Sequence, residues 1–143
     1  IILNLALAII MSVPALNIYT HGTHITVAHA MGSTIGINTM ILLASIFYIL
    51  YDCKVISEKD RNLTFVRKGF WIMNVSLLIF WINLIGIGIL KSYYSFQGLH
   101  HQQFMSLLSP YFVGFLIFGI GIFIGVLFIV LPILKKKNFI LPS

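Results

Sequence analysis

Residues 23–51, "THITVAHAMGSTIGINTMILLASIFYILY", contain no charged side chain. The uncharged stretch begins earlier still, because no Asp, Glu, Lys or Arg occurs from Ile1 to Tyr51. A helix needs about 20 predominantly apolar residues to cross a bilayer. In hydrocarbon such a stretch has to be helical, since each backbone N–H and C=O must find its hydrogen bond within the segment. These residues therefore predict a membrane-spanning helix.

The composition of the whole chain agrees with this prediction. Its 143 residues are 59% hydrophobic and 8% charged, with a mean hydropathy of +1.04, whereas soluble domains carry about a quarter charged residues. The alternating pattern of a membrane β-barrel is absent. We expect an all-α polytopic transmembrane bundle, one membrane domain over residues 1–143, with spans at about 1–13, 20–51, 69–90 and 109–134.

The formal net charge of +6 comes from basic residues at the ends of these spans. They are not interleaved with aromatic residues in a soluble segment, which argues against a nucleic-acid partner. The connection 52–68 holds five of them, the tail after residue 134 holds three, and the connection 92–108 holds none. The positive-inside rule then places 52–68 and the C-terminus in the cytoplasm and 92–108 outside. The basic residues are Lys54, Lys59, Arg61, Arg67, Lys68, Lys91, Lys135, Lys136 and Lys137.

The start of the chain, "IILNLALAII", has no initiator methionine, no basic region and no small-residue cleavage site. It does not have the pattern of a signal peptide. Its apolar residues look like the inside of a helix already under way. We therefore expect the chain to be the C-terminal part of a larger subunit.

His29 lies inside the second span, six to nine residues from its start, or about 9–14 Å along a helix. An imidazole in hydrocarbon is costly unless it is partnered, so it is either a ligand or hydrogen-bonded to a neighbouring helix. Ala28, Gly32 and Gly36 recur beside it at four-residue spacing. Such small residues allow close helix packing or a flat macrocycle against the backbone, and the spacing alone does not separate the two.

Met31 follows His29 by two residues and lies about 200° round the helix from it. One helix would thus offer a ligand on each of two flanks. A thioether sulfur is an axial ligand of haem iron, although methionine also fills gaps in helix packing. His24 lies on the flank of Met31, about two turns higher. His21 lies at the outer mouth of the same helix.

Other polar residues carry weaker signals. His100 and His101 fall in the outward loop, and since no carboxylate or cysteine lies near them we expect solvated side chains. The single cysteine, Cys53, has no partner for an internal disulfide. We expect the polar residues of the third span to make hydrogen bonds between helices, and the glycines of the fourth to mark a packing face. These residues are Asn74, Ser76, Trp81 and Asn83, and Gly114, Gly119, Gly121 and Gly125.

Three stretches carry a resemblance to a known family. "YTHGTHITVAHAMGSTIG" (19–36) resembles the haem-bearing helix of the nitric oxide reductase large subunit, in the haem–copper oxidase superfamily, with its "THGT" at 20–23 and its "AH" at 28–29. "KGFWIMNVSLLIF" (68–80) and "SPYF" (109–112) are similar to the two helices that follow in that family. The resemblance covers nearly the whole chain, as the last three to four of about twelve helices.

The resemblance implies that His29 is the proximal ligand of a high-spin haem b. The family usually has a second histidine two residues later, which binds a low-spin haem b, and this chain has Met31 there. Met31 would then be the axial ligand of that haem, or His24 would replace it, or the haem would be altered or lost. His21, Gly32 and Gly36 would lie at a haem edge or serve packing. The ligands of the non-haem iron are expected upstream of these residues.

The function expected from this resemblance is reduction of nitric oxide to nitrous oxide. The alternatives are a haem–copper oxygen reductase, a nitric oxide dismutase variant, and a haem-free helical transporter or assembly subunit. The expected partners are membrane lipid, an electron donor (cytochrome c, quinol or a cupredoxin) and a small haem c subunit.

Overall fold

The computed structural model describes residues 1–54, 56, 62–98 and 101–135. Within these residues the chain is all-helical and has no strand. Four of the basic residues used to predict the orientation (Lys59, Arg61, Lys136 and Lys137) and His100 lie outside the described residues. The helices are α1 (Ile2–Ser12), α2 (Pro14–Thr20), α3 (His24–Ser33), the π-helix η1 (Thr34–Thr39), α4 (Met40–Asp52), α5 (Asn62–Phe96) and α6 (His101–Lys135).

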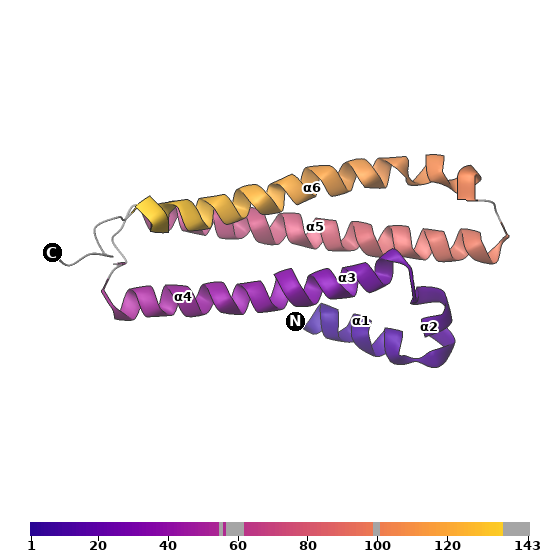
Figure 1. Cartoon of the computed structure of the whole chain (residues 1–143), viewed down its shortest axis with the longest axis horizontal. Coiled ribbons are helices and arrows are strands. Elements are labelled where there is room, and N and C mark those ends of the chain that lie inside the picture. Colours follow the sequence, from indigo (N-terminus) through magenta and orange to yellow (C-terminus); the bar gives the residue numbers. More distant parts are fainter. Residues whose placement is uncertain (55, 57–61, 99–100, 136–143) are drawn as a thin grey trace.

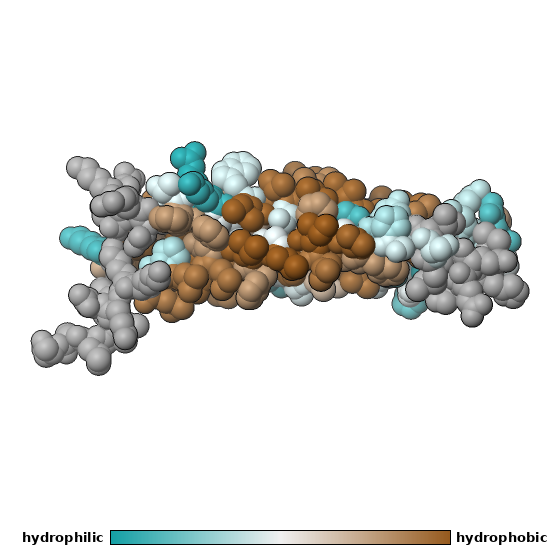
Figure 2. All heavy atoms as spheres, turned by 90° about the horizontal axis from the view of Figure 1, so that it is seen from above, coloured by the Kyte–Doolittle hydropathy of each residue, from teal (hydrophilic) through white to brown (hydrophobic). Residues whose placement is uncertain are grey.

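Helices α5 and α6 form a long antiparallel pair, and α3, η1 and α4 form a rod beside α5 (Figure 1). The short helices α1 and α2 fold back beside α3. Three stretches are long and apolar enough to cross a membrane: His24–Asp52, Leu63–Phe96 and Leu108–Leu134. Figure 2 shows hydrophobic side chains over the middle of one face and hydrophilic ones toward its two ends. The prediction of an all-helical bundle is confirmed for the described residues, and three of its helical stretches are long and apolar enough to cross a membrane.

The first predicted span is bent. α1 ends at Ser12, Val13 is extended, and Pro14 begins α2 at an angle of 105° to α1. Proline lacks the N–H that would continue α1, but its fixed φ suits the first turn of a new helix. The segment predicted at 1–13 is therefore one arm of a bent pair that reaches Thr20.

The two long helices extend beyond their predicted spans. α5 was expected over 69–90 and runs from Asn62 to Phe96, while α6 was expected from 109 and begins at His101. The connections predicted at 52–68 and 92–108 are correspondingly shorter. Hydropathy marks where apolar side chains stop, whereas the backbone hydrogen bonds of a helix continue through polar residues such as Lys68 and Lys91.

Glycines on α6 hold it close to α5. A Cβ at Gly125 would lie 2.7 Å from the Met73 Cβ, and one at Gly114 would lie 3.1 Å from the Asn83 Oδ1. A Cβ at Gly121 would lie 3.0 Å from the Ser76 Cβ. The predicted packing role is confirmed at these three glycines.

The predicted hydrogen bonds between helices are wrong for Asn74 and Asn83. Each side chain donates instead to a carbonyl of its own helix four residues earlier, that of Phe70 at 2.8 Å and that of Ile79 at 2.9 Å. The preceding turn places this acceptor within reach of a short polar side chain, so no neighbouring helix is needed. Asn83 contributes to α5–α6 packing by steric contact, because its side chain lies against Gly114.

The basic end of the bundle follows from the topology. α4 ends, α5 begins and α6 ends on the same side (Figure 1). Lys54, Arg67 and Lys68 therefore lie at the end of the bundle where α6 reaches Lys135. The connection 52–68 and the end of α6 share one side of the spans, as the sequence predicted.

Candidate functional site

A compact turn leads into α3. Gly22 has φ +70°, in the left-handed region that glycine adopts without strain. Thr23 caps α3: its Oγ1 accepts from the Ile25 N–H at 3.2 Å and donates to the Thr20 carbonyl at 2.7 Å. Thr26 Oγ1 donates to the same carbonyl at 3.0 Å. The "THGT" stretch is thus a helix-capping turn that sets where α3 begins.

One face of α3 packs antiparallel against α5. Ile25 lies over Gly88, where a Cβ would come 2.7 Å from the Ile25 backbone nitrogen. One turn further along α3, Ala28 is fully buried in a cluster with Leu84. Continuing along α3 and η1, a Cβ at Gly32 would lie 3.2 Å from the Trp81 Nε1, and one at Gly36 would lie 3.6 Å from the Leu77 Cδ2. The stripe of small residues is used for helix packing.

His29 lies on the flank of α3 that faces α1. Ser33 is four residues further on, on the same side of the helix, and its Oγ accepts a hydrogen bond from the Asn4 amide of α1 at 2.9 Å. α3 begins at His24, so His29 lies about 8 Å along it, a little shallower than predicted. Its side chain is half-buried, and its Nδ1 is buried without a hydrogen-bond partner among the described residues.

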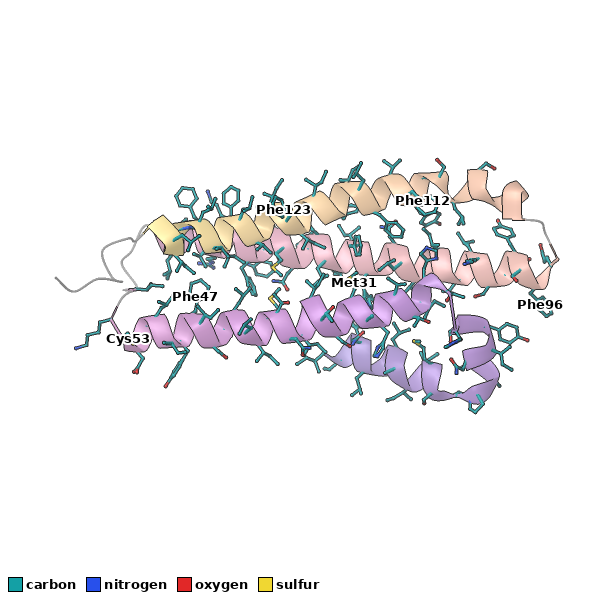
Figure 3. All side chains as sticks on the ribbon, viewed as in Figure 1. Met31, Phe47, Cys53, Phe96, Phe112 and Phe123 are labelled. Carbon is teal, nitrogen blue, oxygen red and sulfur yellow. The ribbon has the colours of Figure 1, made fainter. Side chains whose placement is uncertain are left out.

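Met31 and His24 lie on the other flank. Met31 is half-buried between α3 and α5 (Figure 3) and packs against the cluster of Leu7, Ile25, Ala28 and Leu84. The His24 ring stacks on Phe115 of α6, with centroids 6.3 Å apart and planes 19° apart. Its Nδ1 is also buried with no partner in the described part of the chain. His29 and Met31 thus occupy opposite flanks, as their spacing predicts.

Two polar residues beside this region were not singled out as site residues. Asn4 is 7% exposed, and its Oδ1 is buried without a hydrogen-bond partner among the described residues, as is the Nε1 of Trp81. Both atoms lie next to the position that a Cβ at Gly32 would occupy. An asparagine within the apolar run "ILNLALAII" was a signal that this position is buried against a polar partner.

A π-helical turn follows the candidate ligands directly. η1 covers Thr34–Thr39, and Thr39 Oγ1 donates to the Thr34 carbonyl, five residues earlier, at 2.9 Å. A π-helical turn carries an extra residue and rotates the following helix relative to the preceding one. The face of α4 is therefore not a continuation of the face that α3 presents to α5.

The remaining histidines do not converge with His29. His21 is exposed at the turn between α2 and α3. His101 begins α6, beyond the C-terminal end of α5. Among the described residues no group of three or more His, Cys, Asp or Glu side chains is placed to hold a metal ion.

No protein-family model matches the chain, and no solved structure matches it significantly.

Proposed function

We propose that this chain is the haem-binding C-terminal part of a membrane oxidoreductase that reduces nitric oxide to nitrous oxide. His29 would bind the iron of a high-spin haem b. Met31 binds the iron of a low-spin haem b from the opposite flank of α3, and His24 is the substitute ligand on that flank. The non-haem iron is held by residues upstream of this chain.

The observation that carries the proposal is the lack of a hydrogen-bond partner for His29 among the described residues. His29 lies within a candidate span, and the described residues give its side chain no hydrogen-bond partner, although its Nδ1 is buried. A buried imidazole without a partner is costly in an apolar environment. Ligation of iron by one ring nitrogen, with a polar group of a neighbouring helix at the other, removes that cost.

The low-spin site is supported by the flank that Met31 and His24 share. Met31 lies beside an aromatic and aliphatic cluster that includes Phe80 and Phe115, and His24 stacks on Phe115. Such a surface excludes water from a bound macrocycle. A His/Met pair raises the potential of a haem relative to a bis-His pair, so Met31 would make this haem a better electron acceptor.

The haem supplies the redox chemistry and the binding of nitric oxide. Two NO, two electrons and two protons give one N₂O and one H₂O. The chain fixes the orientation of both axial ligands, because they stand on one helix whose packing face is held against α5 by Ala28 and Gly32. Beside Met31 it also places apolar side chains, including Phe80 and Phe115.

We place the protein in the bacterial inner membrane with the C-terminus in the cytoplasm. The lysines and arginines at the 52–68 connection and after residue 134 support this orientation. The turn at residues 20–23 then faces outward, on the side where a cytochrome c, a cupredoxin or a small haem c subunit delivers electrons.

A haem-free helical subunit of a transporter or assembly is the second candidate. Helix packing against α5 already occupies Gly32 and Gly36, and Met31 packs on the apolar cluster. In this alternative His29 finds its partner in another helix of the assembly. The two candidate functions predict different absorption spectra. A purified haem-free subunit has no Soret band, whereas the oxidoreductase has one.

The test is anaerobic NO consumption by membranes that contain the parent protein, with oxygen consumption measured alongside. We expect NO turnover in the wild type and its loss in His29→Ala, because the high-spin haem loses its protein ligand. His29→Gly with added imidazole should restore the high-spin spectrum. His101→Ala is the matched control, since it removes a histidine outside the candidate spans.

Three outcomes contradict the proposal. Oxygen uptake without NO turnover would assign an oxygen reductase. Unchanged turnover in His29→Ala would exclude the proximal role of His29. Colourless purified protein would exclude haem and favour the second candidate.

A further inference from the structure

A cleft of about 1080 Å³ opens between α4 and the α5–α6 pair, away from the region of His29. Its lining is mostly apolar and aromatic and comes from all three helices. Figure 3 shows Phe47 of α4 in the space between α4 and α5. Binding sites for small molecules are typically about 300–1,000 Å³, so the cleft is large enough for an extended ligand.

The sequence explains why the helices separate here. Small residues bring α3 close to α5 as far as Gly36, and beyond them α4 presents the bulkier Met40, Leu43 and Phe47, which line the cleft. α4 makes no extensive interface with α5 or α6, whereas α3 packs extensively on α5. The rod of α3, η1 and α4 therefore diverges from α5 toward the basic end of the bundle.

Among the described residues, Arg67 is the cation that lines this apolar cleft. Arg67 lies four residues into the candidate span that begins at Leu63, about 6 Å along α5. Asp52 is the only acidic residue in the described part of the chain, and no described residue forms an ion pair with Arg67. Arg67 as a whole residue is exposed. A cation inside a candidate membrane span, beside apolar side chains, marks a candidate anion-binding site.

Two tyrosine side chains add hydroxyl groups to the lining of the cleft. Tyr48 and Tyr51 line the cleft from α4 and are 72% and 56% exposed. Tyrosine is enriched at the level of lipid head groups, where its ring lies in apolar surroundings and its hydroxyl in polar ones. The cleft thus has an apolar body, formed in part by Phe70 and Ile129, and a polar end that carries one positive charge.

We propose that this cleft binds an anionic phospholipid. An acyl chain lies against Phe47, Phe70 and Ile129, and the phosphate is hydrogen-bonded by the Arg67 guanidinium. Basic pockets between membrane helices are recognised sites for anionic head groups, and guanidinium presents paired donors that match phosphate geometry. Charge complementarity favours a lipid over a further helix or a second copy of the chain, because Arg67 has no ion-pair partner among the described residues and a lipid phosphate supplies one. The proposal does not depend on haem binding.

The test is native mass spectrometry of the full chain, purified in a neutral detergent and titrated with two lipids of identical acyl chains. We expect phosphatidylglycerol to bind more tightly than phosphatidylcholine. Arg67→Gln should weaken phosphatidylglycerol binding about five- to tenfold and remove the preference. Lys68→Gln is the matched control, since it removes the same charge one residue further on but does not line the cleft, and it should preserve the preference.

A second variant tests the apolar body without changing charge. Ala44 lines the cleft from α4, so Ala44→Trp fills it and should weaken both lipids. This measurement stands even where Arg67→Gln fails to fold, and circular dichroism of each variant identifies such a failure.

Four results overturn the proposal. The first is equal binding of the two lipids by the wild type. The second is an unchanged response to either variant: a preference for phosphatidylglycerol that survives in Arg67→Gln, or lipid binding that survives in Ala44→Trp. The third is displacement of phosphatidylglycerol by inorganic phosphate, which would indicate a site for the free ion. The fourth is a disulfide-linked dimer of Phe47→Cys in a Cys53→Ser background, which would show that a second copy covers the cleft.

Discussion

The Asn4 amide of α1 donates a hydrogen bond to the Ser33 hydroxyl at the end of α3, with Nδ2 and Oγ 2.9 Å apart. The two residues are separated by 29 positions, and Asn4 is 7% exposed. This bond joins the bent N-terminal pair to the helix that carries His29. It also places Asn4 beside Gly32, on the flank that His29 shares.

The Asn4–Ser33 bond should contribute measurably to stability. Hydrogen bonds between membrane helices contribute about 0.6 kcal/mol on average and up to about 1.7 kcal/mol. A double-mutant cycle of Asn4→Ala and Ser33→Ala, measured by unfolding in mixed micelles, should give a coupling in this range. Ser45→Ala is the control, because Ser45 Oγ bonds to the Ile41 carbonyl of its own helix. A coupling of zero would mean that the bond adds nothing.

Gly32 and Gly36 should respond differently to alanine. A Cβ at Gly32 would collide with the Asn4 Oδ1 and lie 2.8 Å from the Asn4 Cγ, whereas one at Gly36 would meet the Leu77 Cδ2 at 3.6 Å, an ordinary contact. We expect Gly32→Ala to destabilise the chain by about 1–3 kcal/mol through overpacking. Gly36→Ala should be neutral or gain up to about 1 kcal/mol from helix propensity. The same unfolding assay compares them, and equal effects would refute the contact at Gly32.

The α5–α6 interface allows a similar comparison. Gly125→Ala places a methyl group 2.7 Å from the backbone nitrogen of Met73, a group that cannot rotate away. Gly119→Ala meets the Phe80 Cε2 at 4.0 Å. We expect Gly125→Ala to cost about 1–3 kcal/mol and to reduce disulfide trapping between cysteines placed on the two helices. A large loss of trapping in Gly119→Ala would contradict this packing.

Substitution of Met31 tests the proposed low-spin ligand. Met31→Leu keeps the volume and removes the thioether sulfur, so the low-spin signal should disappear while the high-spin signal of the His29 haem remains. Met31→His should retain the low-spin haem at a lower midpoint potential, because imidazole replaces thioether. Redox titration followed by optical spectroscopy measures both. An unchanged low-spin spectrum in Met31→Leu, with loss in His24→Leu, would assign the ligand to His24.

The spans were predictable because their signal is local. A run of uncharged side chains must form hydrogen-bonded backbone wherever it enters hydrocarbon, so residues 20–51, 69–90 and 109–134 indicated helices without knowledge of their neighbours. The spacing of His29 and Met31 fixed their opposite flanks in the same way. Helix ends were less predictable, because α5 continues from Asn62 to Phe96 through lysines that end the apolar run.

Polar partners were harder to predict than spans. Asn83 in the third span suggested a bond between helices, yet its amide donates to the Ile79 carbonyl of the same helix. Asn4 makes the bond between helices instead, to Ser33. Whether an asparagine bonds to its own helix or to a neighbouring one depends on how its helix is rotated about its axis. No single position in the sequence specifies that rotation.

The amino-acid sequence by itself specified a helical membrane protein, the positions of its apolar stretches, the clustering of its basic residues and the flanks of α3 that carry His29 and Met31. These features follow from hydropathy and helical periodicity, which act over a few residues. The packing of the helices specified what faces each flank: α1 bonded to Ser33 on the flank of His29, Phe115 beside His24, and a cleft at Arg67 where α4 leaves α5. Those relationships depend on side chains that are distant in sequence, on the bend at Val13 and on the π-helical turn at Thr34–Thr39. Only the simultaneous fit of these surfaces determines which of them come together.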